Sequence, residues 1–331
     1  MINKKIKLLF VLLLAFGLLA ACKKNVGTEE DNAIPASADE VTADKEYVFG
    51  FSCISMENPY YITLESAIRE VIEDEGVTMI TKDPASDSDL QIEQIQGMIE
   101  SGIDAIFLSP VDWEAIEPAL EELKQAGVKI INVDTHVKNT EYVDAYIGSD
   151  NKTAGYLCGE NLIERCPDGG KVVILEGLNI HSITERITGF EEAISTAENG
   201  FTIAVRQDVQ GDLEKALEAT KEILKKEEDI VAIMCGSDQT ALGALVAVNA
   251  AGADDILIYG VDGSPDLKKE LKKANTSIAG TAAQSPINMG KEAAEIGLAI
   301  LRDESFEKET YTDVFFVDKN NVEMYGIDGW Q

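Results

Sequence analysis

The sequence predicts an α/β fold of two lobes, each built on a doubly wound, Rossmann-like parallel sheet, joined by a multi-stranded hinge with a ligand cleft between the lobes. Two observations predict it. Short apolar strands alternate with amphipathic helices from about residue 47 to about residue 302, and about ten strands in such a stretch fit two sheets better than one. A matching strand–helix–strand unit also occurs in each half of the chain.

The elements of the first lobe follow one another in regular alternation. Tyr47–Cys53 is a β-rich run, and a helix with Leu64 and Ile68 on one face begins at about Pro59 and is stopped by Gly76. The run at Val128–Val133 is almost continuously apolar, which is typical of a parallel strand buried on both faces. The remaining predicted elements are strands at Val77–Thr81, Ala105–Leu108 and Val143–Gly148 and helices at Leu90–Ser101 and Glu114–Ala126.

The alternation continues in the second lobe. A last long helix is predicted near Pro286–Arg302, where apolar residues recur at helical spacing. The strands of this lobe, with helices between them, are predicted at Lys171–Leu175, Phe201–Arg206, Ile230–Cys235, Ile256–Gly260 and Ile278–Ala283.

The two matching units each deliver an aspartate at the end of a strand. The first runs from Ala105 to Asp134, a separation of 29 residues, and the second from Ala232 to Asp262, a separation of 30. Open α/β sheets bind their ligands at the carboxyl ends of the strands. The pattern therefore predicts two matched aspartates that face one shared cleft.

The first 22 residues have the features of an export signal. Lys4, Lys5 and Lys7 precede an apolar run of 14 residues, Leu8–Ala21, which is too short to span a bilayer comfortably. The run ends in Leu-Ala-Ala-Cys, which resembles the lipobox of bacterial lipoproteins. That resemblance implies removal of residues 1–21 and lipidation of Cys22, and so a lipid anchor at the extracytoplasmic face of the cell membrane; the alternative is an ordinary signal peptide. Residues 22–45 are acidic and without hydrophobic periodicity, which indicates a flexible tether.

Acidic residues dominate the charge of the chain. The 60 Asp and Glu outnumber the 28 Lys and Arg, giving a formal net charge of −32, which disfavours a nucleic-acid partner. The sequence contains no common nucleophile-elbow, zinc-protease, phosphate-loop or dinucleotide motif. Two histidines cannot form a His-rich metal site, and Asp208–Asp212 lacks the glycine and glutamate of a calcium loop. We therefore expect no catalytic residues, no cofactor and no metal.

Short motifs follow the strands in a set order. They are Asn58-Pro59-Tyr60-Tyr61, Asn132-Val133-Asp134, Gly148-Ser149-Asp150-Asn151, Arg186 with Gly189-Phe190, Ser237-Asp238, Gly260-Val261-Asp262-Gly263 and Ala283-Gln284. In this combination the chain resembles the periplasmic sugar-binding proteins of the ribose- and galactose-binding type (type I periplasmic binding proteins), whose fold is shared by lactose-repressor-type ligand domains. The resemblance covers roughly residues 46–318. It implies an N-terminal lobe of residues 46–148 and 285–311 and a C-terminal lobe of residues 149–284 and 312–331.

The resemblance implies a solute-binding lipoprotein of an ABC importer and not an enzyme. Such a protein, expected to be a monomer, captures a monosaccharide-like solute by hinge closure and delivers it to the permease subunits. A second hypothesis is a ligand-sensing subunit for a chemoreceptor or sensor kinase, and a related one changes the ligand to a nucleoside, polyol or autoinducer. A third is a secreted carbohydrate-processing enzyme that uses Asp134 and Asp262 as paired carboxylates.

The resemblance also implies where the ligand binds. A sugar needs bidentate hydrogen-bonding groups for its hydroxyls and aromatic plates for its apolar faces. Two positions depart from a ribose binder, since Gly211 stands in place of a phenylalanine and Ser237 in place of an asparagine, and this leaves the identity of the sugar open. The implied ligand residues are Asn58, Tyr60, Tyr61, Asp134, Arg186, Asp262 and Gln284, with Trp113, His181 and Ser237 as further candidates.

Overall fold

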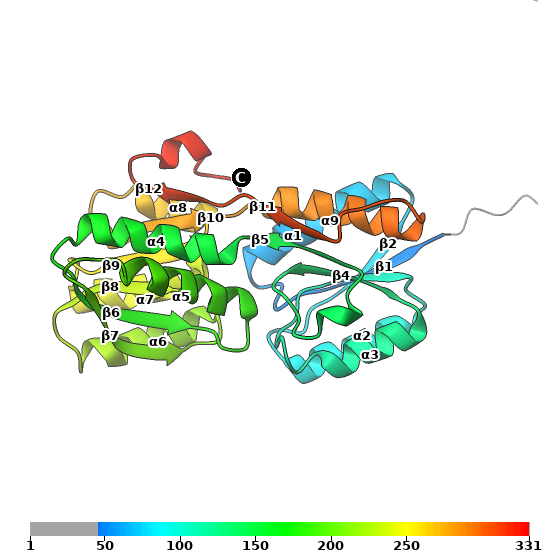
Figure 1. Cartoon of the computed structure of the whole chain (residues 1–331), viewed down its shortest axis with the longest axis horizontal. Helices are drawn as coiled ribbons and strands as arrows, with labels where there is room; N and C mark the ends of the chain where they lie inside the picture. Colours follow the sequence, from blue (N-terminus) through cyan, green and yellow to red (C-terminus); the bar gives the residue numbers. More distant parts are fainter. Residues whose placement is uncertain (1–45, 331) are drawn as a thin grey trace, which may run out of the picture. The chain divides into compact units, whose positions relative to one another are not determined.

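The structure is a computed structural model that describes residues 46–330 (Figure 1). The predicted signal peptide, the predicted tether and Cys22 lie outside the described residues. Between residues 46 and 330, no helix has both the length and the apolar character needed to cross a membrane.

One sheet of six parallel strands organises the first lobe. Its order from edge to edge is β11-β5-β4-β3-β1-β2, with β4 and β3 in the middle. The strands are β1 (Val48–Ser52), β2 (Thr78–Lys82), β3 (Ala105–Leu108), β4 (Lys129–Asp134), β5 (Ala145–Ser149) and β11 (Glu309–Thr312). The helices are α1 (Pro59–Asp74), α2 (Ser88–Glu100), α3 (Glu117–Ala126) and α9 (Pro286–Leu301), with a short 3₁₀ turn at Thr140–Tyr142. We call these elements the N-terminal lobe.

The second lobe repeats the plan. Its sheet has the order β12-β10-β9-β8-β6-β7, and its pairs are parallel except for the edge pair of β10 with β12. The strands are β6 (Gly170–Glu176), β7 (Phe201–Asp208), β8 (Ile230–Cys235), β9 (Leu257–Asp262), β10 (Ile278–Ala283) and β12 (Phe315–Asp318). The helices are α4 (Asn151–Arg165), α5 (His181–Ile194), α6 (Leu213–Leu224), α7 (Asp238–Ala251) and α8 (Pro265–Leu271), followed by a 3₁₀ turn at Val322–Tyr325. We call these elements the C-terminal lobe, and the predicted fold class is confirmed.

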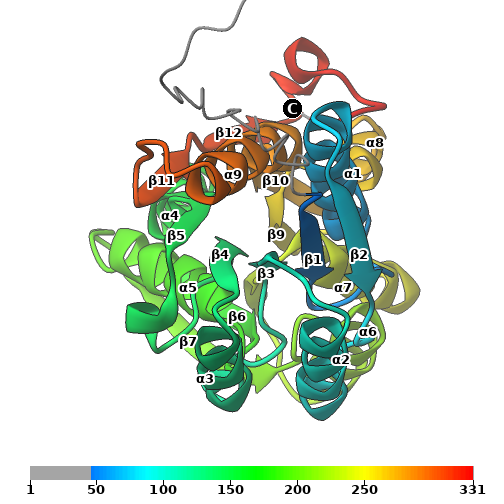
Figure 2. The same cartoon turned by 90° about the vertical axis from the view of Figure 1, so that its right-hand side faces the viewer.

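Helices cover both faces of each sheet and enclose four apolar cores. In the N-terminal lobe α1 and α9, which lie side by side in Figure 2, bury one face, and α2 and α3 bury the other. In the C-terminal lobe α6, α7 and α8 bury one face, and α4 and α5 the other. Strands covered on both faces must be apolar along their whole length, which explains the continuous apolar runs in the sequence.

Helix α1 shows how the sequence sets one of these elements. The side chain of Asn58 accepts a hydrogen bond from the backbone N–H of Tyr60, and Pro59 opens the helix with a residue whose missing N–H costs nothing there. Leu64, Ile68 and Ile72 then recur at helical spacing and are completely buried. Burial of each such side chain contributes about 1.5–3 kcal/mol, so the apolar stripe fixes which face of α1 meets the sheet.

The chain crosses between the two sheets three times. The crossings connect β5 to α4, β10 to α9, and β11 to β12. The sequence predicts ten strands, and the two that it misses are β11 and β12. Both have only four residues and lie at the edge of a sheet, and β11, with the sequence Glu-Thr-Tyr-Thr, has almost no apolar residue by which to recognise it.

Helix α3 begins at Glu117 and not at Glu114 as the sequence predicts. Pro118 explains the later start, because in a helix already formed at residue 114 its ring would clash with the carbonyl of that residue. The side chain of Asp112 instead accepts hydrogen bonds from the backbone N–H groups of Glu114 and Ala115 and holds a turn before the helix.

Helices α4 and α5 approach so closely that only glycine fits at Gly155. A Cβ atom added there would collide with the backbone carbonyl of Arg186 on α5. At Gly97 on α2 the same added atom would meet nothing within 4 Å, and the position is exposed. The two glycines therefore lie in helices but differ in what surrounds them.

We expect Gly155→Ala to destabilise the protein by about 1–3 kcal/mol, because the clash forces the two helices apart. Gly97→Ala should be neutral or stabilise by up to about 1 kcal/mol, because alanine is the better helix former. Urea denaturation of both variants and of the parent protein measures the difference. Equal stabilities for the two variants would contradict the close packing of α4 on α5.

Candidate ligand-binding site

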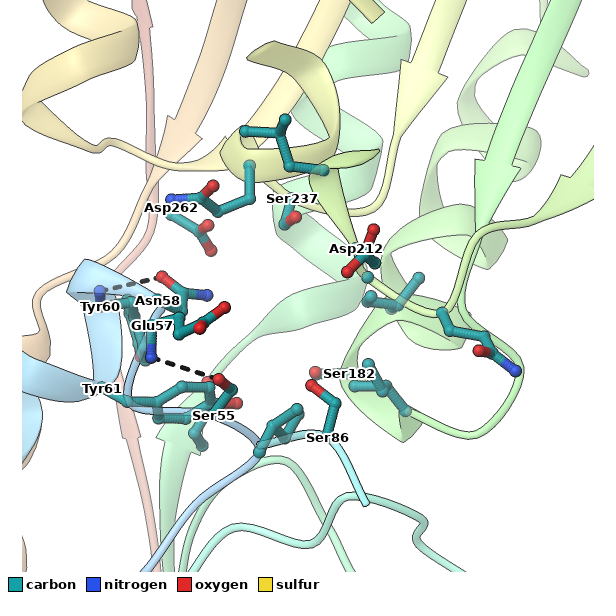
Figure 3. Close-up of a pocket in the computed structure, with 18 of the residues that line it drawn as sticks. Ser55, Glu57, Asn58, Tyr60, Tyr61, Ser86, Ser182, Asp212, Ser237 and Asp262 are labelled. Atoms are coloured by element: carbon teal, nitrogen blue, oxygen red, sulfur yellow. Dashed lines mark hydrogen bonds between the residues drawn. The ribbon is translucent and has the colours of Figure 1, made fainter. Parts of the chain in front are cut away.

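A cavity of about 430 Å³ lies where the strands of both sheets end. Its wall comes from the loops that follow the carboxyl ends of β1, β2 and β4 in the N-terminal lobe and of β6, β7, β8 and β9 in the C-terminal lobe. Figure 3 shows Asn58, Tyr60 and Tyr61 on one side of this space and Ser182, Asp212, Ser237 and Asp262 around the rest. This is the place at which open α/β sheets bind ligands.

Asp134 and Asp262 occupy matching positions in the two lobes. Each is the last residue of its strand, β4 or β9, and each is almost completely buried. Both have positive φ angles, 66° for Asp134 and 138° for Asp262. Residues other than glycine rarely adopt such angles, and held outliers of this kind gather at functional sites. The predicted pair of aspartates is present in one cavity wall.

Asp134 is held by the phenol of Tyr61. The Tyr61 hydroxyl donates to Oδ2 of Asp134 at 2.8 Å, and the hydroxyl of Ser109 lies 3.3 Å from the Tyr61 oxygen. Burial raises the pKa of Asp134, while Arg186 and Tyr61 lower it in part. Burial also holds the pKa of the Tyr61 phenol well above its usual value, so Tyr61 keeps its proton and acts as the donor.

Arg186 joins three parts of the C-terminal lobe. Its Nε donates to the side chain of Asn151 at 2.8 Å, and Nη1 donates to the carbonyl of Gly236 at 2.8 Å. Nη1 also lies 3.4 Å from Oδ1 of Asp262. Both side chains of this pair are almost fully buried, and a buried guanidinium needs such partners to offset the loss of water. The geometry fixes Arg186 as a rigid donor at the cavity wall.

Asp262 accepts hydrogen bonds from several directions. Besides Arg186, its partners are the side-chain amide of Gln284 at 3.1 Å and the backbone N–H of Asp238 at 3.3 Å. Burial raises the pKa of Asp262 well above its usual value of 3.8; Arg186 opposes the rise, and the neighbouring carboxylate of Asp238 adds to it. Burial and the nearby Asp238 therefore both disfavour the ionised form of Asp262.

The other predicted ligand residues lie in different places. Asn58, Tyr60 and Ser237 line the cavity, Asn58 and Ser237 also being the caps of α1 and α7. Gln284 is completely buried and does not line the cavity; it holds Asp262 instead. Its carbonyl oxygen Oε1 finds no hydrogen-bond partner among residues 46–330.

Trp113 and His181 lie outside the cavity wall and stack on each other, with ring centroids 4.6 Å apart. Trp113 belongs to the N-terminal lobe and His181 opens α5 of the C-terminal lobe, so this stack joins the lobes. Backbone and side-chain hydrogen bonds accompany it, since Asn179 accepts from the N–H of Trp113 at 3.1 Å and donates to the carbonyl of Val111 at 2.8 Å. These residues brace the lobes beside the cavity.

Several wall residues were not predicted from the sequence. They are Ser55, Glu57 and Ser86 in the N-terminal lobe and Ser182, Gln210, Asp212, Glu214 and Gln239 in the C-terminal lobe. A signal was available for many of them, because their loops follow predicted strands at the carboxyl end. Gln210, Gly211 and Asp212 belong to the segment that the sequence excludes as a calcium loop, and among residues 46–330 no group of His, Cys, Asp and Glu is arranged to hold a metal ion.

The charge of the wall restricts its ligands. Five carboxylates line it, those of Glu57, Asp134, Asp212, Glu214 and Asp262, whereas Arg186 is the one basic residue among the described lining residues. Arg186 is already shared with Asp262. A phosphate or carboxylate ligand would meet net repulsion, and a neutral ligand rich in hydroxyl donors would find acceptors.

Comparison with known proteins assigns the family. A family model described as a periplasmic binding protein domain matches residues 49–305. The chain belongs to this family. The resemblance seen in the sequence motifs is thereby confirmed, and the cavity between two α/β lobes is the arrangement that these motifs imply.

Relatives of this periplasmic binding protein extend over most of its length. The ribose import binding protein of Bacillus subtilis is 31% identical over 265 residues, which are 80% of this chain and 85% of that protein. A solved ABC transporter solute-binding protein from Mycobacterium smegmatis with bound glycerol has a TM-score of 0.80 at 26% identity and covers 87% of this chain and 98% of its own. A periplasmic solute-binding protein from Actinobacillus succinogenes with bound D-allose has a TM-score of 0.76 at 27% identity and covers 85% of this chain and 100% of its own.

We expect Asp262→Asn to reduce the pH dependence of stability. Because the pKa of Asp262 is raised in the folded protein, the folded state holds this proton more tightly than the unfolded chain does. Stability is then fully present below the unfolded pKa, near 3.8, and is lost as the pH rises through the folded pKa. Urea denaturation at about pH 5 and about pH 8 should show a smaller loss for Asp262→Asn than for the parent.

The matched control is Asp168→Asn, at an exposed position far from any cavity wall residue in the sequence. It should keep the pH dependence of the parent protein. If the free energy of unfolding changed with pH equally in the parent protein and in Asp262→Asn, ionisation of Asp262 would cost the folded state no stability, which would contradict this prediction.

Proposed function

We propose that this periplasmic binding protein captures a monosaccharide-like solute in the cavity between its lobes and delivers it to the permease of an ABC importer. The observation that carries the proposal is the matched pair of buried aspartates, Asp134 and Asp262, set at strained strand ends beside the fixed donor Arg186. Carboxylates that each accept from two hydroxyls and a planar donor are the groups that a sugar requires.

Each side chain has a role in this proposal. Tyr61 donates to one oxygen of Asp134, and the carboxylate, with about four acceptor positions, can accept a ligand hydroxyl as well. Asn58 uses its oxygen to cap α1, which leaves its amide N–H groups for the ligand. Tyr60 and Tyr61 meet edge to face, with centroids 5.5 Å apart, and give the wall apolar aromatic surface. Gln284 acts through Asp262 and not through the ligand.

The relatives support a sugar or a polyol. Their names refer to ribose import for the Bacillus subtilis protein and to galactofuranose for a protein of Escherichia coli that is 28% identical over 263 residues. The solved neighbours contain D-allose and glycerol. Gly211 and Ser237, the two positions at which the sequence departs from a ribose binder, both line this cavity, so the identity of the sugar stays open.

Closure of the lobes explains how binding and delivery are linked. The lobes are joined by three chain crossings, an arrangement that permits bending at a hinge. Beside the cavity they also contact each other directly, as in the hydrogen bond from the N–H of Ser182 to the hydroxyl of Thr135 at 2.9 Å. A solute that bonds both Asp134 and Asp262 favours the closed form, which a permease recognises.

The amino-terminal segment completes the proposal. Cys22 follows an apolar run and two alanines, so we propose that it is lipidated after removal of residues 1–21. The acyl chains would hold the protein at the extracytoplasmic face of the membrane, with residues 22–45 as the tether.

We expect Asp134→Asn to weaken binding of the solute by about ten- to a hundredfold, because charged hydrogen bonds contribute about 1.5–3 kcal/mol each. Thermal-shift and titration-calorimetry measurements with pentoses, hexoses, polyols and nucleosides identify the solute in the parent protein. A ligand at about 100 times its Kd should stabilise the folded state by about 2.7 kcal/mol.

The matched control is Asp303→Asn, which changes an aspartate that also has a positive φ, 54°, but is exposed. It should bind like the parent protein. If both variants bind the solute as tightly as the parent, Asp134 is not a ligand residue; if the sugar is consumed on incubation, the protein is an enzyme and not a binding protein.

We expect Cys22→Ser to abolish membrane anchoring, because only a thiol at this position accepts the lipid in the lipobox reading. In a bacterial host that processes lipoproteins, the parent protein should fractionate with membranes and carry the mass of the acyl group. The variant should lack that mass. An unchanged mass for the parent protein would instead identify residues 1–21 as an ordinary signal peptide or as an uncleaved segment.

A further inference from the structure

A second cavity of about 200 Å³ adjoins the first. Asn58, Gln239 and Asp262 line both, so these three residues form the partition between the two spaces. Beyond the partition the wall is formed by Asp238, Asp266 and Trp330 among others. An aromatic ring together with carboxylates and amides is the composition that suits a sugar or an attached ring, as in the main cavity.

Trp330 reaches this place from the far end of the chain. The segment after β12 packs on the C-terminal lobe through Val322, Tyr325 and Ile327. Trp330 itself packs against the core of the N-terminal lobe, where its ring meets that of Tyr60 edge to face at 5.7 Å. The tail thus starts on one lobe, ends on the other, and closes the second cavity with its last described residue.

A buried lysine holds this tail in place. The ammonium group of Lys268 donates to the carbonyl of Gly329 at 2.6 Å, one residue before Trp330. Lys268 is completely buried. Lysine is almost never fully buried unless a partner group offsets the cost of removing its ammonium group from water. Asp238, which lines the second cavity, acts on Lys268 as a compensating negative charge.

The partition also has free hydrogen-bonding groups. Within the described residues, the side-chain amide of Gln239 and the amide nitrogen of Asn58 make no hydrogen bond. Asp238, in contrast, already accepts a hydrogen bond on each oxygen, from the N–H of Ser264 and from the hydroxyl of Thr281. A ligand that lies across the partition could therefore bond Asn58 and Gln239 while its ends occupy the two cavities.

We propose that the second cavity is a subsite for a substituent on the bound sugar, namely a second sugar ring or the aglycone of a glycoside, with Trp330 as the surface against which that ring packs. The proposal rests on the proposed function, since the main cavity must hold the first ring. It makes Trp330 a specificity-determining residue, although the sequence places it more than 260 residues from Asn58.

The test compares parent sugars with their substituted forms in titration calorimetry. The probes are D-ribose, D-allose and D-galactose, each with its methyl glycoside, its phenyl glycoside and a disaccharide that contains it. At least one phenyl glycoside or disaccharide should bind about tenfold or more tightly than its parent sugar. In Trp330→Ala and in Lys268→Met the substituted sugar should bind no more tightly than its parent sugar does in the same variant, whereas Trp330→Phe should keep most of the gain.

Met324→Ala is the matched control, because Met324 belongs to the same tail but is 80% exposed. It should bind parent and substituted sugars like the unaltered protein. The subsite is refuted if a parent sugar binds and all of its substituted forms bind more weakly. It is also refuted if Trp330→Ala weakens both classes equally, since the ring then only holds the lobes together. If no pentose, hexose, polyol or nucleoside binds the folded protein, the proposed function itself fails.

Discussion

The buried guanidinium of Arg186 is the group on which the geometry of the cavity depends. It bonds the first residue of α4, the end of β8 and the end of β9 through Asn151, Gly236 and Asp262. A guanidinium taken out of water costs several kcal/mol unless its partners are held in place. The three elements are therefore fixed relative to one another, and Gly155 is required because the backbone of Arg186 presses on α4.

The single positive charge of Arg186 does not balance the buried aspartates around the cavity. Asp134, Asp238 and Asp262 are all buried, and burial raises the pKa of each, while one guanidinium serves the group. Asp134 and Asp262 are in addition held at positive φ. Backbone strain and unmet charge of this kind persist only where the packing of the surrounding fold holds the residues in place. Hydroxyl donors from a solute would offset the unmet charge, because they stabilise the ionised carboxylates without bringing a charge of their own.

Sequence patterns sufficed to predict the layers of the fold, because parallel strands buried on both faces are continuous apolar runs. They also sufficed for the paired aspartates, because each one ends a strand at nearly the same separation from the start of its strand–helix–strand unit. They failed where the signal is not local. Strand β11 is polar and becomes a strand only through pairing with β5, and the start of α3 depends on one proline. The burial of Gln284 behind Asp262 follows from tertiary packing, which a single strand end does not reveal. The position of Trp330 depends on Lys268, some sixty residues away, and no periodicity in the tail reveals it.

The direct contacts between the lobes contribute to the balance between the open and closed forms of the proposed function. On one flank they include the Trp113–His181 stack and hydrogen bonds from Ser182 and Asn179; elsewhere they include Trp330 against Tyr60. Each such hydrogen bond contributes about 0.5–1.5 kcal/mol and each aromatic pair a similar amount. A conformational equilibrium of that size shifts only as far as the differential affinity of the ligand for the two forms allows.

Asp134 and Asp262 lie on different lobes, so a solute that bonds both gains its second set of hydrogen bonds only in the closed form. In the proposed function, the matched aspartates thus couple recognition to closure.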